Sequence, residues 1–373
     1  MHQLLASAQG PRFVMARPGS VGGLQLPPAW FRELEVAVTT EGELPAWLIE
    51  KARAVWGLDL HGQSAADTVL VRPSPSLGFS RATWEINQGC NFNCEHCYLA
   101  QRKFEGLDWE GKKRLLDIVR DSGALWFQFT GGEPTADRDF HRAWEYAFRL
   151  GMLLEVLTNG SRLHSPEVIG LLRTHPPQKV VVSLYGASKE TAEAVTRTPK
   201  AFDLVVKGLE AARAAGINVE IALVVTKANI HEIDAMRGIA RQYARSYKEY
   251  KSISPTYDGQ PDPLATQALG ESDRAEVFTG CPAGHTFFHA DPWGRATMCK
   301  VGRENPIDLM REGVFGLRAL PGISDAQMLR TGGCQGCKLS GTCRVCRPMA
   351  KAFQAAKAPL ESYCQHRRKE APA

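Results

Sequence analysis

The sequence predicts an α/β fold built around a parallel sheet. Between Arg81 and about Tyr257, short runs of β-branched and aromatic residues alternate with segments of helical periodicity. Strands that alternate with helices in this way form βαβ units, and the strands of such units run parallel. The pattern contains about six units, which is too few to close an eight-stranded barrel. The 373 residues are enough for two or three domains.

The predicted strands are short, apolar and bounded by turn residues. They are Thr83–Asn87, Ala124–Thr130, Leu153–Thr158, Lys179–Leu184, Asn218–Thr226 and Ser252–Tyr257. The predicted helices between them have apolar residues on one face, as Leu115, Leu116 and Val119 show for the first. They are Trp109–Asp121, Asp137–Leu150, Phe202–Ala215 and His231–Ser246.

A small α+β segment is expected before this region. Its predicted elements are a hairpin, two helices and a strand, namely Arg12–Ala16, Leu24–Leu26, Pro27–Thr39, Leu44–Trp56 and Thr68–Arg72. The run Pro73-Ser74-Pro75-Ser76 predicts a linker. The expected domains are therefore residues 1–78, 79–262 and 263–373.

Three cysteines lie in the run GCNFNCEHCY. Cys90, Cys94 and Cys97 have the spacing C-x3-C-x2-C. A four-iron cluster is normally held by four Cys thiolates, so three thiolates leave one iron open. A structural metal site closes its ligand shell, whereas a reactive site keeps a vacancy. On this motif alone, a zinc site or a chance cluster of cysteines is the alternative.

A glycine-rich turn follows the strand at Ala124–Thr130. The run TGGEPT contains Gly131, Gly132 and Glu133, and glycines after a strand let the backbone approach a ligand. Together, CNFNCEHCY and GGEP resemble the radical S-adenosylmethionine (radical SAM) superfamily. The resemblance implies a partial (β/α)6 barrel in which the three cysteines hold a [4Fe-4S] cluster. It also implies that the open iron and the GGEP turn bind SAM, which the reduced cluster cleaves to a 5′-deoxyadenosyl radical.

Further SAM contacts are implied by the same resemblance. Active sites of parallel sheets form at the carboxyl ends of strands, where Asn159 and Ser183 are expected. In the family, Ser183 would contact the SAM carboxylate or ribose, Arg197 would pair with the carboxylate, and Leu223 would flank the adenine. The alternatives are a turn at Asn159, a solvated Arg197 and a core Leu223.

Seven further cysteines lie towards the end of the chain. They are Cys281, Cys299, Cys334, Cys337, Cys343, Cys346 and Cys364. This series resembles the SPASM extension of radical SAM proteins, which holds two auxiliary [4Fe-4S] clusters. The resemblance implies one cluster on Cys334, Cys337, Cys343 and Cys364, and another on Cys281, Cys299 and Cys346 with an open or non-Cys fourth ligand. Only two residues separate Cys343 from Cys346, where the family usually has three, and a four-cysteine zinc site is the alternative.

The charge and composition narrow the possible functions. Residues 333–373 contain eight Lys and Arg and two Glu and so carry +6, which leaves −1 for the rest of the chain and gives the net charge of +5. These cations surround five cysteines and are expected to offset an anionic cluster rather than to bind nucleic acid. We find no apolar run of membrane-spanning length and no secretory signal at Met1–Ser7. Ten cysteines without an export signal favour metal ligation in the reducing cytoplasm.

These features predict a radical SAM/SPASM enzyme that matures a ribosomally synthesised peptide, as the SLYGA run at 183–187 also suggests by resemblance. The expected cofactors are SAM and three [4Fe-4S] clusters, and the expected partners are a precursor peptide and an electron donor such as flavodoxin or ferredoxin. An oxidative cross-link is the expected product. Residues 1–78 resemble a winged-helix element that binds a leader peptide by β-augmentation, although a structural cap is equally compatible. The alternatives are a small-metabolite dehydrogenase or decarboxylase, and a non-catalytic iron–sulfur or zinc protein.

Overall fold

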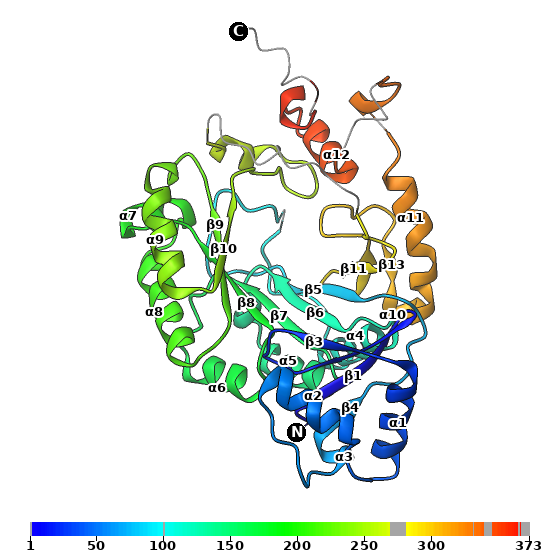
Figure 1. Cartoon of the computed structure of the whole chain (residues 1–373). Coiled ribbons are helices and arrows are strands. Elements are labelled where there is room, and N and C mark those ends of the chain that lie inside the picture. The colour runs from blue at the N-terminus through cyan, green and yellow to red at the C-terminus, as the bar shows by residue number, and fades with distance from the viewer. Residues whose placement is uncertain are drawn as a thin grey trace.

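The protein contains two sheets, a small one near the N-terminus and a large curved one (Figure 1). The computed structural model describes residues 2–99, 101–268, 281–330, 332–338, 345–364 and 366. The small sheet has the strand order β3-β2-β1-β4, and the large sheet has the order β10-β9-β8-β7-β6-β5-β11-β12-β13. The α/β class predicted from the sequence is confirmed.

Six parallel strands form the centre of the large sheet, in chain order from β5 to β10. They are β5 (Arg81–Asn87), β6 (Trp126–Gly131), β7 (Leu153–Thr158), β8 (Lys179–Leu184), β9 (Val219–Val224) and β10 (Ser246–Tyr250). This is the open partial barrel that the sequence predicts. Because all six strands run the same way, their carboxyl ends meet at one edge and bring the following loops together.

Amphipathic helices connect these strands and cover their outer face (Figure 1). They are α4 (Trp109–Asp121), α5 (Phe140–Arg149), α6 (Pro166–Thr174), α7 (Lys189–Thr196), α8 (Ala201–Ala214) and α9 (Ile233–Tyr243). Asp108 begins α4 by accepting a hydrogen bond from the Gly111 backbone, and the helix buries Leu115, Leu116 and Val119. The sequence analysis missed α6 and α7, which are short.

The sixth strand lies earlier in the chain than predicted. We expected Ser252–Tyr257, but β10 spans Ser246–Tyr250 and the predicted segment has no regular structure. Pro255 explains this failure, because proline cannot donate a ladder hydrogen bond. The sequence of β10 is SYKEY, whose alternate residues are exposed. An edge strand with so few apolar residues gives a weak strand signal, and the predicted helix His231–Ser246 included only its first residue.

The C-terminal part of the chain extends the large sheet beyond β5. Strand β11 (Phe287–Ala290) pairs parallel with β5, and the antiparallel strands β12 (Arg295–Thr297) and β13 (Ile307–Asp308) follow. Helices α10 (Leu309–Glu312), α11 (Leu320–Gln327) and α12 (Arg347–Ala355) come afterwards. Phe288 and Met298 join the same apolar core as the barrel. The predicted boundary near residue 262 therefore does not separate two cores, although the domain division stays a prediction.

The N-terminal segment packs its own core and then rests on the barrel. It contains β1 (Leu4–Gln9), β2 (Arg12–Ala16), β3 (Gly23–Leu26), α1 (Pro28–Thr39), α2 (Ala46–Trp56), α3 (Ala65–Thr68) and β4 (Val69–Val71). The β2–β3 hairpin agrees with the sequence analysis, which missed β1. Leu5 and Ala16 form a second small core with Leu125 and Leu153 of the barrel.

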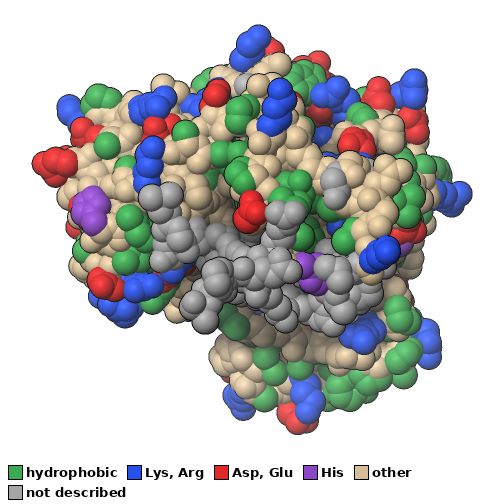
Figure 2. Space-filling model, turned by 90° about the horizontal axis from the view of Figure 1, so that it is seen from above, with side chains coloured by type: hydrophobic (Ala, Val, Ile, Leu, Met, Phe, Trp, Pro, Cys, Tyr) green, Lys and Arg blue, Asp and Glu red, His purple; other side chains and the backbone are tan. Residues whose placement is uncertain are grey.

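Two surface properties bear on the predicted partners. Among the described residues, no helix combines the length and the apolar character that a membrane span requires. Seen from above, Lys and Arg side chains are spread over the described part of the face with Asp and Glu side chains among them (Figure 2).

Candidate active site

A cavity of about 570 Å³ extends through the barrel interior and reaches the carboxyl ends of the barrel strands. Its walls include a loop after β5, the end of β6, the turn after β7 and the end of β8. Seven residues singled out in the sequence line it: Cys90, Cys94, Cys97, Gly131, Gly132, Asn159 and Ser183. The three-cysteine loop and the GGEP turn, which are 34 residues or more apart in the chain, thus face one space.

The GGEP turn lies directly against the cysteine loop. A Cβ atom at Gly131 would lie 2.0 Å from the Asn87 carbonyl oxygen, and one at Gly132 would lie 2.0 Å from that of Gly89. Gly131 also has a φ of +132°, a conformation that L side chains rarely adopt. The Glu133 backbone N–H donates to Gly89 O at 2.8 Å. Glycine is therefore required here because two backbones approach each other beside the cavity.

Glu133 is fully buried, and its carboxylate connects two loops. It accepts hydrogen bonds from Thr135 N at 3.0 Å, Thr135 Oγ1 at 2.5 Å, Thr158 Oγ1 at 2.7 Å and Asn159 N at 2.7 Å. Burial raises the pKa of Glu133, while these hydrogen bonds oppose that rise. The residue is not part of the cavity wall. Its contact with SAM stays a prediction, whereas its contact with the turns after β6 and β7 is direct.

Asn159 links the turn after β7 to the cysteine loop. Its Nδ2 donates to Asn91 Oδ1 at 2.9 Å and lies 3.7 Å from the Cys90 sulfur. Its Oδ1 accepts from the backbone and hydroxyl of Ser161. The side chain is therefore held in one orientation between the turn and Cys90.

The donor set of the loop suits an iron–sulfur cluster, since soft thiolates select such clusters. Burial raises the pKa of Cys90 to about 11, and it also raises the pKa of Cys94. Both are protonated thiols at neutral pH, so metal binding must release their protons. Burial lowers the pKa of His96 to about 4, which makes it neutral. Within the described ranges, no three His, Cys, Asp or Glu side chains converge on a single ion; the thiolates of a cluster bind different irons and need not converge.

Two further predicted SAM contacts, besides Glu133, lie outside the cavity wall. Leu223 is fully buried in the barrel core, while its neighbours Ala222 and Val224 line the cavity. Side chains alternate along a strand, so Leu223 faces the opposite side of β9. Arg197 is not part of the cavity wall either. Its Nη2 atom pairs with Glu95 Oε2 at 2.8 Å, and its side chain is 57% exposed.

Several cavity residues were not singled out from the sequence. Lys179 lines the cavity together with Val181 and Ser183, and Glu220 does so together with Ala222 and Val224. The period of two along β8 and β9 was the available signal, because every second residue of a barrel strand faces inward. Tyr98 and Tyr185 also line the cavity, as do Arg81, Lys248, Tyr250 and Lys300.

The later cysteines fall into two neighbourhoods. Burial raises the pKa of Cys346 to about 11, and nearby Cys299 and Cys281 raise it further. Cys334 and Cys364 both raise the pKa of Tyr363, after the larger effect of burial. Cys337 donates its backbone N–H to Cys334 O at 3.3 Å. The neighbourhoods match the two predicted ligand sets, which stay predictions; Cys343 lies outside the described residues.

One buried carboxylate connects the first cysteine loop with the region of Cys299. Glu85 on β5 accepts from the Tyr98 hydroxyl at 3.1 Å and from Arg303 Nη2 and Nη1 at 2.6 and 3.0 Å. Tyr98 follows Cys97, and Arg303 lies shortly after Cys299. Burial would raise the pKa of Glu85, but His289 and Arg303 bring it well below its usual range.

Comparison with known proteins finds a family match for part of the chain. Residues 84–238 match the model of the Radical SAM superfamily. This range contains the three-cysteine loop, the GGEP turn and strands β6 to β9. Residues 84–238 therefore form a Radical SAM domain.

Two curated relatives match 59% and 43% of the chain. Mycofactocin maturase MftC of Mycobacterium tuberculosis (strain H37Rv) is 29% identical over 242 residues, which are 59% of this chain and 60% of that protein. An AdoMet-dependent heme synthase of Methanosarcina barkeri is 32% identical over 162 residues, covering 43% of this chain and 46% of that protein. The chain thus spans about 60% of the length of MftC and less of the heme synthase.

Solved structures share the fold over more of the chain. Streptococcus suis SuiB, crystallised with the precursor peptide SuiA, has a TM-score of 0.63 at 16% identity and covers 97% of this chain and 98% of its own. The anSMEcpe structure with bound AdoMet has a TM-score of 0.52 at 15% identity, covering 76% of this chain and 96% of its own. At this identity the likeness concerns the fold.

Proposed function

We propose that this chain is a radical SAM/SPASM enzyme that modifies a ribosomally synthesised peptide. The observation that carries the proposal is the cavity, where three thiols and two backbone-exposing glycines face one space at the strand ends. The names of the relatives support the substrate class, because MftC is a maturase and SuiB was crystallised with a precursor peptide.

The residues in and around the cavity have different roles in the proposed reaction. Cys90, Cys94 and Cys97 would hold the cluster, and Gly131, Gly132, Asn159 and Ser183 would form the wall against SAM. When bound, the cluster and SAM together supply a radical that abstracts a hydrogen atom from the substrate. The chain supplies position and exclusion of water: Glu133 and Asn159 hold the loops, and the barrel wall encloses the reacting groups.

The later cysteines complete the proposed redox chemistry. Cys281, Cys299 and Cys346 would hold one auxiliary cluster, and Cys334, Cys337, Cys343 and Cys364 another. A cluster held by these cysteines would offer an acceptor for the electron that the peptide radical must lose, together with a proton, when an oxidative cross-link forms. An external donor such as flavodoxin or ferredoxin, in the reducing cytoplasm, would supply the first electron.

The N-terminal sheet is a candidate site for the leader peptide. Strand β3 is the edge of that sheet, and a groove of about 690 Å³ separates it from the base of the barrel. Leu24 and Val21 line this groove with Trp126, and the exposed edge allows β-augmentation by an extended peptide. We expect Leu24→Asp to weaken precursor binding and Val36→Asp, on the exposed side of α1, to leave it unchanged. Equal affinity of both variants for the precursor would mean that the N-terminal segment covers the barrel and does not bind the leader peptide.

The division of labour can be tested with two cysteine variants. After anaerobic reconstitution and dithionite reduction, the triple variant Cys90/Cys94/Cys97→Ala should release no 5′-deoxyadenosine. Cys346→Ala should still release it but form no product from the precursor peptide encoded beside the gene. The wild-type product should be two hydrogens lighter by mass spectrometry. Sustained 5′-deoxyadenosine release by the triple variant would refute the assignment of the active cluster.

Metal content tests the number of clusters. Three four-iron clusters predict about twelve irons per reconstituted chain. Elemental analysis that finds about four irons and one zinc would favour the zinc site among the later cysteines.

A small-metabolite substrate is the second candidate. The heme synthase relative favours it, because its name indicates a heme product rather than a peptide. Turnover of a small metabolite with an unchanged precursor peptide would decide for this candidate.

A further inference from the structure

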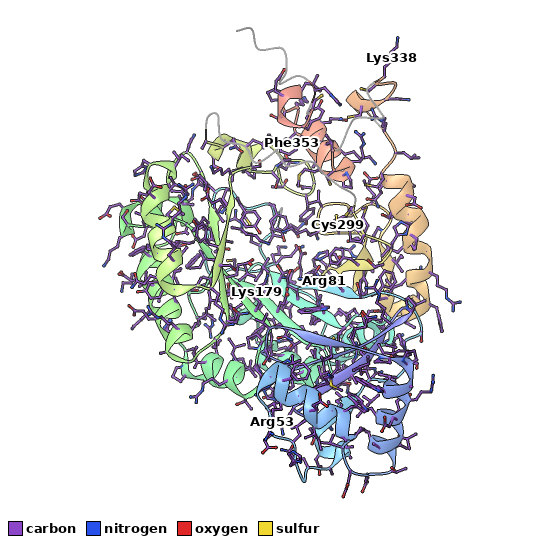
Figure 3. The ribbon with its side chains drawn as sticks, viewed as in Figure 1. Arg53, Arg81, Lys179, Cys299, Lys338 and Phe353 are labelled. Carbon is purple, nitrogen blue, oxygen red and sulfur yellow. The ribbon has the colours of Figure 1, made fainter. Side chains whose placement is uncertain are left out.

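Cations outnumber carboxylates in the wall of the barrel cavity. The described wall contains Arg81, Arg102, Lys179, Lys248 and Lys300, but Glu220 is its single carboxylate. Arg81 pairs with Glu155, which lies just outside this wall, and Lys179 pairs with Glu220 at 3.4 Å. Figure 3 shows Arg81 and Lys179 inside the barrel, below Cys299 in that view. Two cations are thus neutralised at the base of the cavity.

The three remaining cations differ in their surroundings. Arg102 donates to Asn93 Oδ1 and to Cys94 O, so it holds the cysteine loop. Lys248 and Lys300 have no carboxylate within ion-pair distance in the part of the chain that the structure describes. A peptide that enters the cavity would meet two lysines that no described carboxylate pairs at ion-pair distance. Burial lowers the pKa of Lys300, and nearby Glu85 opposes that fall.

The two lysines stand on opposite sides of the open barrel. Lys248 lies on β10, the edge strand at one end of the sheet, and Lys300 follows β12, near the other end. Figure 1 shows β10 and β11–β13 on opposite sides of the barrel interior. Because the barrel is not closed by hydrogen bonds between these two ends, both lysines flank the gap in its wall.

Aromatic side chains accompany both lysines. Tyr250 lies two residues after Lys248, on the same face of β10, and is 47% exposed. The Lys300 ammonium lies 5.0 Å from the centroid of the Tyr98 ring, whose hydroxyl is fixed by Glu85. Each side of the gap therefore presents a positive charge beside a flat ring.

We propose that the substrate segment entering the barrel carries a carboxylate that Lys248 and Lys300 bind. The inference rests on the proposed peptide-modifying function and adds the chemistry of the substrate. The carboxylate comes either from an Asp or Glu side chain or from the C-terminus of the peptide. Lys300 also neighbours Cys299 and can offset the charge of a cluster there, so Lys248 gives the cleaner test.

Binding of defined peptide mixtures to the reconstituted, SAM-loaded full chain tests the proposal. The probe is an equimolar mixture of acetylated nine-residue peptides, randomised at three central positions and made with either a C-terminal amide or a free carboxylate. Peptides retained by the protein are identified by mass spectrometry. We expect a carboxylate, in a side chain or at the C-terminus, to give about fivefold more retention than an amide in its place. We expect added salt to reduce this preference. Enrichment among the amidated peptides assigns the carboxylate to a side chain, and enrichment of the free-carboxylate set assigns it to the C-terminus.

Variants of Lys248 separate charge recognition from other effects. Lys248→Gln should reduce the enrichment, and Lys248→Glu should favour Lys-containing peptides instead. Lys207→Gln, an exposed lysine on α8, should leave the preference unchanged. SAM binding by the Lys248→Gln variant, measured by equilibrium dialysis, should equal that of the wild type. Weaker SAM binding would assign Lys248 to SAM and overturn the proposal.

Two negative results have different meanings. If the wild-type chain retains peptides without regard to charge, the carboxylate proposal is overturned and the peptide function stands. If it retains no peptide while it still binds SAM, this inference is overturned, and the peptide function is decided separately by the assay with the full precursor peptide.

Discussion

At the residue scale, Glu133 shows how a motif residue can act on its neighbours. Its carboxylate uses four hydrogen bonds to hold the turns that follow β6 and β7. Two of these bonds end at Thr158 and Asn159, and Asn159 in turn contacts the Cys90 loop. A carboxylate that accepts from several donors fits this position because it is an acceptor only.

We expect Glu133→Gln to destabilise the apo chain by about 2 kcal/mol, because the amide NH₂ would face donors and leave buried groups unsatisfied. Urea unfolding of the full chain measures this, with Glu50→Gln, whose side chain is 77% exposed, as control. SAM binding should weaken in the same variant. A free energy of unfolding equal to that of the control would mean that Glu133 does not hold the turns.

The thiol pKa values predict how assembly of the first cluster depends on pH. Burial raises the pKa of Cys90 to about 11, so the thiol keeps its proton at pH 7 and must lose it to bind iron. Raising the pH from 7 to 9 should therefore increase apparent iron affinity by about tenfold per pH unit for each thiol that deprotonates. Iron uptake is compared with that of the Cys90/Cys94/Cys97→Ala variant, so that the difference isolates this loop. Uptake at the loop that is flat or falls over this range would contradict the prediction.

At the element scale, the contact between the GGEP turn after β6 and the loop after β5 positions the three cysteines. The Gly132 N–H donates to Asn87 O at 3.1 Å while its Cα faces Gly89 O. The chain segments that follow two neighbouring parallel strands thus cross in close backbone contact. This contact fixes the position of the cysteine loop.

We expect Gly132→Ala to abolish cluster assembly at this loop, because its Cβ would lie 2.0 Å from Gly89 O and push the two backbones apart. Gly170→Ala in α6 is the matched control, since a Cβ there meets nothing within 4 Å. That control should be stabilised by about 0.5–1 kcal/mol, since alanine is the better helix former. Iron content and thermal unfolding report both effects; a normal iron content in Gly132→Ala would show that the crossing can relax.

Elements with strong periodicity were predictable, and elements defined by long-range pairing were not. The bounds of α4, β7 and β8 agree with the sequence analysis because each buries a full apolar face. Strands β10, β12 and β13 were missed, since short or polar edge strands are stabilised by neighbours that are distant in sequence. The same limit applies to the site. Spacing indicated Cys90 and Gly132, but only register shows that Ala222 rather than Leu223 faces the cavity.

At the scale of the whole molecule, Glu85 and Arg303 join the barrel to the segment after Cys299. Arg303 also lies over the Tyr257 ring at 4.1 Å, and the Tyr257 N–H donates to Tyr98 O at 2.9 Å. The buried pair therefore fixes the region of the proposed auxiliary site against the loop of the proposed SAM cluster.

We expect Arg303→Met to destabilise the apo chain by about 3 kcal/mol, because it leaves the Glu85 carboxylate buried without its bidentate partner. The double variant Glu85→Gln/Arg303→Met should recover part of the loss. Arg311→Met, which removes an exposed pair with Glu312, should leave the unfolding midpoint unchanged. Chemical unfolding of the three variants provides the measurement, and equal midpoints for Arg303→Met and Arg311→Met would contradict the expected role.

The pairing of β11 with β5 has a consequence for how the chain reaches its native state. Contacts between these strands join residues 206 positions apart, such as Thr83 and His289. Contacts of high sequence separation slow folding, because a long loop must close before they form. On the ribosome, β5 would therefore wait with one edge uncovered until β11 has emerged. Nascent chains that end between these strands should expose this edge and recruit chaperones, as incompletely folded proteins commonly do.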